Sequence, residues 1–198
     1  QQNHRIRLRD KVETAITQGA GIFRGLERGG PSIGAALSAV LRQPFEFAMP
    51  DLYPKFDMGV ASIKSGDIED MLKSANLNGL PSVLYSGDGG LNLVIKQEGG
   101  RFVGNTAAPI AQEVLNFLQS KHSYGDKVTG RILDEHFTGL GYGWDRTVLL
   151  LVLAALLRAG AIEVTHHGRR YRSYSDPMAR EPYTNQTAFK AASFAPRA

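Results

Sequence analysis

The chain of 198 residues contains no cysteine. This absence excludes disulfide scaffolds, thiolate zinc sites and cysteine nucleophiles, and it is typical of proteins from a reducing compartment. We therefore expect a cytoplasmic protein. Because 42% of the residues are hydrophobic, the chain has enough apolar side chains for a packed core, and general disorder is not expected.

Long apolar segments are also missing. The longest run without a polar side chain covers the ten residues 148–157. A helix from Asp145 to Ala159 would span only about 22 Å, against roughly 30 Å for the hydrocarbon core of a bilayer. We predict a buried core helix here and no membrane partner. The N-terminal sequence QQNHRIRLRD lacks the apolar core of a secretory signal and an initiator Met, which indicates a piece of a longer protein.

A strong net charge and catalytic motifs are lacking as well. The formal net charge is +4, which is too small to predict nucleic-acid binding by itself. The segment 59–67 contains Lys64 followed by a serine, but it lacks the glycine that precedes the lysine of a Walker A loop. No carboxylate pair and no set of serine, histidine and acid stands out. We therefore predict no enzyme activity, no catalytic residue and no cofactor.

The N-terminal part is predicted to begin with a helix and to end in a connector. Apolar residues at helical spacing place a helix at about 5–18, namely Leu8, Val12 and Ile16. A short strand is expected at 21–25 and a second helix from Pro31 onward. Three prolines are expected to prevent regular structure across the connector 43–56, namely Pro44, Pro50 and Pro54.

A further helix and a hairpin complete the region 1–107. Asp67 is a suitable N-cap for a helix with one apolar stripe. The runs 91–96 and 101–103 resemble two strands joined by a glycine-containing turn. We describe 1–107 as a helical and β-hairpin region, whose hairpin also allows a degenerate winged-helix-like unit.

Stronger signals follow and predict a winged-helix-like domain over 108–175. A helix is expected at 109–121, a short helix capped by Thr129, and the apolar helix capped by Asp145 and ended by Gly160. A β-hairpin over 161–174 comes next, which gives the element order of a winged helix. The last residues, 176–198, are expected to form a wrapping C-terminal tail anchored by two phenylalanines, Phe189 and Phe194. The predicted fold class is α+β, mainly helical with β-hairpins.

The apolar helix argues against base reading, and the wing is the remaining candidate for contact with nucleic acid. A helix that is apolar all round has no face with which to contact base edges, which leaves only Arg146 and Thr147. The candidate nucleic-acid-binding residues lie on and beside the wing turn: His166, His167, Arg169, Arg170 and Arg172. The alternative is a solvated hairpin whose charges prevent edge-to-edge aggregation.

No metal site is predicted. His166 and His167 are neighbours, and adjacent residues of a strand point to opposite faces. No carboxylate lies at a useful sequence spacing from them. His136 lacks the second histidine of a zinc-protease helix, so we expect a surface or capping residue.

The C-terminal part resembles one known family. The motifs that carry the resemblance are VTG at 128–130, YGW at 142–144, LLRAGAIEV at 156–164, GRRY at 168–171 and the spaced pattern DP.AREP.TN..AF..ASF.P at 176–196. This series is similar to a segment of the P-loop ATPase component of bacteriophage-exclusion (BREX) defence systems. Weaker similarity extends upstream through DLYPKF, NLNGLPSVL and NTAAPIAQEVLNFL.

The resemblance implies a bacterial antiphage assembly with partners such as a DNA methyltransferase. Since the Walker motifs of the parent ATPase are absent, the resemblance implies no ATP binding by this chain. Two hypotheses remain. The first is a non-catalytic interaction or scaffold module that packs against other domains or subunits of the same defence assembly. The second is a DNA-contacting winged-helix module that uses the wing 166–172 for weak, non-specific binding of duplex DNA.

Overall fold

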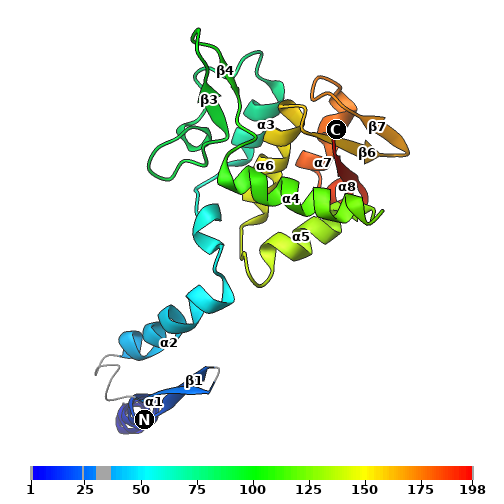
Figure 1. Cartoon of the computed structure of the whole chain (residues 1–198). Coiled ribbons are helices and arrows are strands. Elements are labelled where there is room, and N and C mark those ends of the chain that lie inside the picture. Colours follow the sequence, from blue (N-terminus) through cyan, green and yellow to red (C-terminus); the bar gives the residue numbers. More distant parts are fainter. Residues whose placement is uncertain (1, 24, 30–36, 198) are drawn as a thin grey trace. The chain divides into compact units, whose positions relative to one another are not determined.

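The chain forms two compact units, Gln1–Pro54 and Lys55–Ala198. The computed structural model describes residues 2–23, 25–29 and 37–197 (Figure 1). The division lies far from the boundary expected at residue 107, because the hairpin that precedes this residue packs on the C-terminal helices, with Gly104 against Ala159.

The described residues of the smaller unit form two helices and a two-stranded antiparallel sheet. Its elements are α1 (Gln2–Thr17), β1 (Ala20–Phe23), β2 (Leu26–Gly29) and α2 (Leu37–Leu52). The predicted first helix and strand are confirmed, whereas β2 was not expected. The predicted helix start at Pro31 lies outside the described residues.

The prediction that the connector 43–56 lacks regular structure is wrong for most of its length, because α2 continues through Pro44 and Pro50. A proline inside a helix removes one backbone hydrogen bond, but the cost is local and the rest of the ladder can persist. The side chains of Arg42 and Glu46 form an i, i+4 ion pair of 2.5 Å across the turn that contains Pro44, which supports the helix there.

In the larger unit, the first elements are a helix and the predicted hairpin. They are η2 (Phe56–Gly59), α3 (Ser65–Lys73), η3 (Ser82–Leu84), β3 (Val94–Lys96) and β4 (Phe102–Gly104). The hairpin is confirmed, with Gly99 and Gly100 at positive φ in its turn. Asp67 is not the N-cap: Lys64 is, and the Asp67 carboxylate accepts a 2.9 Å hydrogen bond from the Lys64 backbone N–H.

The next helices begin and end where the sequence predicts. They are α4 (Pro109–Ser123), α5 (Gly130–Thr138), preceded by β5 (Val128–Thr129), and α6 (Arg146–Arg158). The Thr129 hydroxyl accepts from the Ile132 N–H, and the Asp145 carboxylate accepts from the Thr147 N–H. Gly160 follows α6 with a φ of +74°. These are the caps that the sequence indicates.

The C-terminal segment forms helices and a strand, whereas the sequence predicted a wrapping tail. After the hairpin of β6 (Ile162–His166) and β7 (Arg169–Tyr171), the C-terminal segment contains α7 (Pro177–Thr184), α8 (Gln186–Ala191) and β8 (Ser193–Pro196). Strand β8 lies inside the four-stranded sheet β5-β8-β6-β7 and pairs antiparallel with β5 and β6. Phe189 and Phe194 are buried as expected, but the segment is part of the fold and not a wrapping strap.

The element order expected for 108–175 is present, but in the sheet β8 is inserted between β5 and β6. Helices α4, α5 and α6 and the hairpin β6–β7 follow one another along the chain. Strand β5 pairs with β8, which separates it from the hairpin. The fold is therefore α+β and mainly helical, with small antiparallel sheets.

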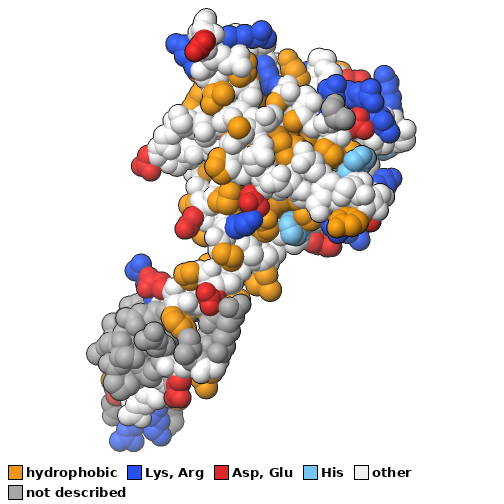
Figure 2. All heavy atoms as spheres, viewed as in Figure 1, with side chains coloured by type: hydrophobic (Ala, Val, Ile, Leu, Met, Phe, Trp, Pro, Cys, Tyr) orange, Lys and Arg blue, Asp and Glu red, His pale blue; other side chains and the backbone are white. Residues whose placement is uncertain are grey.

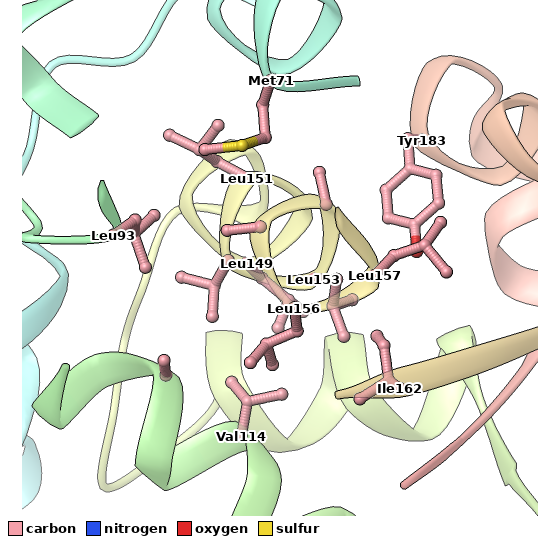
Figure 3. Close-up of a cluster of buried hydrophobic side chains, with 14 of the residues drawn as sticks. Met71, Leu93, Val114, Leu149, Leu151, Leu153, Leu156, Leu157, Ile162 and Tyr183 are labelled. Atoms are coloured by element: carbon pink, nitrogen blue, oxygen red, sulfur yellow. The ribbon is translucent and has the colours of Figure 1, made fainter. Parts of the chain in front are cut away.

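Helix α6 is the centre of the larger unit. Nine of its residues are buried, at Val148, Leu149 and 151–157, and Leu150 is partly buried. Figure 3 shows side chains of neighbouring elements around it, among them Met71 of α3, Val114 of α4, Ile162 of β6 and Tyr183 of α7. The prediction of a core helix is confirmed. Among the described residues, no helix is both long and apolar enough to cross a membrane.

We expect Leu153→Ala to lower the free energy of unfolding of the larger unit by about 2–5 kcal/mol, because it leaves a cavity at a position with no solvent exposure. Chemical denaturation followed by circular dichroism measures this. Leu150→Ala in the same helix is the matched control and should cost clearly less, since Leu150 is partly exposed. If both variants lost the same free energy of unfolding, the conclusion that α6 is enclosed on the side of Leu153 would be contradicted.

Candidate functional site

The wing is a tight hairpin with a two-residue turn. His167 and Gly168 form this turn with φ values of +48° and +73°, the signs that a type I′ turn requires. Along β6, Ile162, Val164 and His166 are buried and alternate with less buried residues. The register pairs Thr165 with Arg170 and His166 with Arg169. Side chains alternate along a strand, so Arg169 lies on one face of the sheet and Arg170 and Arg172 lie on the other.

Each of the three wing arginines lies near a carboxylate. The Nε atoms of Arg170 and Arg172 are 3.2 Å and 3.0 Å from the two carboxylate oxygens of Glu163, whose side chain is only 13% exposed. Arg169 lies on the other face, 3.9 Å from the Asp176 carboxylate. The positive charge expected for phosphate binding is thus partly neutralised by Glu163 of β6 and by Asp176, the N-cap of α7.

A hollow of about 560 Å³ lies over the face that carries Glu163. Its cationic lining residues are Lys127, Arg170, Arg172 and Arg197, and its acidic ones are Asp126 and Glu163. Figure 2 shows Lys and Arg side chains with acidic ones among them at the β6–β7 end. Arg146 is separate, because its guanidinium binds the Asp134 carboxylate in a bidentate pair of 2.6 and 2.7 Å.

The two histidines lie together, which corrects the expectation that they point apart. His166 is 4% exposed at the end of β6, whereas His167 belongs to the turn and its positive φ brings its ring to within 3.9 Å of the His166 ring. Glu181 of α7 reaches both rings: its Oε2 is 3.3 Å from His166 Nε2 and 3.9 Å from His167 Nε2. No local sequence pattern indicates this carboxylate, because Glu181 lies 15 residues from His166 along the chain.

A second polar cluster, missed at the sequence level, fixes the turn before α6. The Glu113 carboxylate accepts hydrogen bonds from Lys55 Nζ at 2.5 Å and from the Tyr142 hydroxyl at 2.7 Å. Burial alone would raise the pKa of Glu113, but these hydrogen bonds outweigh it and lower the pKa from its ordinary value. The Trp144 indole N–H donates to the Lys55 carbonyl at 2.9 Å. The cluster therefore anchors the YGW motif to the start of the larger unit.

His136 is part of the aromatic packing beside this cluster and is neither a simple surface residue nor a cap. Its ring stacks on Phe117 at a centroid distance of 4.1 Å and also contacts Phe137 and Tyr142. Burial lowers the pKa of His136, and the positive charges of Lys121 and Lys55 lower it further.

Comparison of the chain with known protein families, with curated proteins and with solved structures finds no match.

The lowered pKa of His136 predicts a loss of stability in mild acid. The unfolded chain takes up a proton at this residue near pH 6.5, whereas the folded chain does so only at lower pH, so the folded state loses stability as the pH falls through this window. We expect the melting temperature to decrease from pH 7.5 to 5.5 by less in His136→Gln than in the wild type. His122→Gln, at an exposed position of α4, is the matched control. An unchanged pH dependence in His136→Gln would refute this assignment.

Proposed function

We propose that this chain is a non-catalytic interaction module of a bacterial antiphage-defence ATPase, and that it acts in the cytoplasm. In this proposal, the smaller unit binds another domain or subunit of the same assembly. The observation that carries the proposal is the exposure of large apolar side chains on the smaller unit, at Ile6, Leu8, Val12, Ile22 and Phe45.

The exposed apolar residues of α1 form a short stripe. Leu8 and Val12 are one helical turn apart and are 65% and 49% exposed. Within the part of this unit whose burial is described, no residue is buried. Burial of apolar surface is worth about 25 cal/mol per Å², so a partner that covers this stripe would gain stability from it. Exposed cations flank the stripe at Arg7, Arg9 and Lys11, which favours a partner surface with carboxylates around an apolar centre.

The larger unit acts in this proposal as a winged-helix-like scaffold with an added strand, β8. Support comes from the motifs at 142–144 and 156–164, whose residues Trp144 and Arg158 make contacts that stabilise the fold. Trp144 stacks on Phe137, and Gly59 packs so closely on the indole that an added Cβ would lie 2.3 Å from it. Arg158 donates hydrogen bonds to the Met71 and Ser74 carbonyls at the end of α3. Such residues stabilise a scaffold and provide no reaction chemistry.

The proposal is tested by co-expressing the tagged chain with the other proteins of a bacteriophage-exclusion system and measuring which of them co-purify. We expect the double variant Leu8→Ser/Val12→Ser to lose the bound subunit, because two polar side chains in the contact remove its apolar area. Leu140→Ser is the matched control, since Leu140 is 72% exposed but lies on the larger unit. Absence of any co-purifying subunit, or equal recovery with both variants, would refute the proposal.

A second candidate function is weak binding of duplex DNA, favoured by the four cations that line one hollow. Lys127, Arg170 and Arg172 lie on the same side, as a DNA-binding face requires. Two features oppose strong binding. Glu163 pairs with Arg170 and Arg172, two of the three wing arginines, and the enclosed helix α6 cannot enter the major groove.

This second function predicts that Glu163→Gln binds DNA more tightly than the wild type, because the substitution frees two arginines for phosphates. Fluorescence anisotropy with a labelled duplex, measured over a range of salt concentrations, checks this. Two neutralised phosphates correspond to a slope of about −1.8 in log affinity against log salt. The control Arg170→Ala/Arg172→Ala should abolish the gain. No detectable binding by Glu163→Gln would rule out the wing as a DNA contact.

A further inference from the structure

Three potential metal ligands converge from two elements that are separate in the sequence. His166 and His167 come from the β6–β7 hairpin, and Glu181 comes from the second turn of α7. One ligand atom from each of the three lies within 4.8 Å of the others. No partner is required from outside the larger unit, so the site is complete within one folded body.

The spacing fits a small tetrahedral ion. With zinc-to-nitrogen and zinc-to-oxygen distances of about 2.0–2.1 Å, neighbouring ligand atoms of a tetrahedral site are separated by about 3.3 Å. The His166 Nε2 to Glu181 Oε2 distance is 3.3 Å, and the His167 Nε2 to Glu181 Oε2 distance is 3.9 Å. The first pair therefore already has the required separation, and only the exposed His167 ring has to move closer.

The backbone holds the ligands in these positions for identifiable reasons. The sheet register places the His166 side chain on the buried face of β6, where it is 4% exposed. His167 takes a left-handed conformation, which a histidine adopts more readily than most residues with a side chain. Glu181 is turned toward the hairpin from α7, which packs on β6. The fold thus brings the three ligands together, with His166 and Glu181 on β6 and α7 and His167 in the tight turn.

The chemical types of the three ligand side chains determine which ion the site prefers. Two imidazoles and one carboxylate suit zinc and related transition ions, whereas magnesium and calcium prefer all-oxygen sites. The side chains of His167 and Glu181 are 67% and 39% exposed, so the fourth coordination position faces solvent. A water molecule or a ligand atom from a partner could occupy it.

We propose that His166, His167 and Glu181 bind one zinc ion that ties the tip of the β6–β7 hairpin to α7. The ion would replace the weak 3.3 Å contact between Glu181 and His166 with two strong bonds and add a third to His167. It would also give the turn a fixed position beside the wing arginines. This site is independent of the proposed function, which rests on the smaller unit.

The test uses the full chain, prepared without a polyhistidine tag and stripped with a chelator. Isothermal titration with zinc sulfate should give one site per chain, and titration with magnesium should give none. At a zinc concentration about 100-fold above the dissociation constant, the melting temperature should rise by roughly 5–10 °C. Cobalt substituted at the site should give the intense visible absorption of a tetrahedral ion.

Two variants distinguish a metal site from a simple hydrogen bond between histidine and glutamate. His167→Asn keeps a residue that tolerates the left-handed turn, and Glu181→Gln keeps the size of the side chain. Each should weaken zinc binding at least ~100-fold, since loss of even an outer-shell partner costs about 10–100-fold. His122→Ala is the matched control and should bind as the wild type. Absent zinc binding, or binding that survives both substitutions, would overturn the proposal.

Discussion

The burial of nine of the ten apolar residues 148–157 of α6 is the constraint on which the rest of the larger unit depends. Ten consecutive apolar side chains cannot remain in water, so elements from distant parts of the sequence must cover them. Helix α3 covers one side, α4 and α5 others, and β6 and α7 complete the enclosure (Figure 3). Polar groups act only at the two ends of the helix. Asp145 caps the start, and Arg158 near the end binds the carbonyls of Met71 and Ser74.

This constraint also limits what the unit can do. The enclosed side chains of α6 are all apolar, so ionisable groups of the larger unit gather around this helix and not on its enclosed faces. Among the described residues, two places where such groups gather are the β6–β7 hairpin and the cluster around Glu113. The second is used structurally, since its hydrogen bonds fix the turn that leads into α6 and tie it to Lys55. In the hairpin, ionisable groups gather on both faces, with Arg170 and Arg172 at Glu163 on one face and the two histidines at Glu181 beside the turn.

The features that the sequence predicts well are those decided by neighbouring residues. Thr129, Asp145 and Gly160 mark helix ends because each acts on backbone groups within a few positions. Strand β8 was missed, since its polar and proline-containing surroundings resemble a tail and its partners Val128 and Val164 lie far away along the chain. The pairing of Glu163 with two arginines and the approach of Glu181 to the histidines were missed for the same reason. Both depend on strand register and on helix placement, which no local pattern encodes.

The two-residue turn at His167 and Gly168 determines the chemistry of both faces of the hairpin. Positive φ at both positions closes this short turn, and the strands pair with Val164 opposite Tyr171 and Thr165 opposite Arg170. A slip by one residue would turn every β7 side chain to the opposite face, so that Tyr171 would leave the core and arginines would enter it. The core therefore fixes the register, because Tyr171 is 5% exposed and an unpaired buried arginine would be costly. Through that register, hydrophobic burial determines that Arg170 and Arg172 meet Glu163 on one face while the two imidazoles meet Glu181 beside the turn.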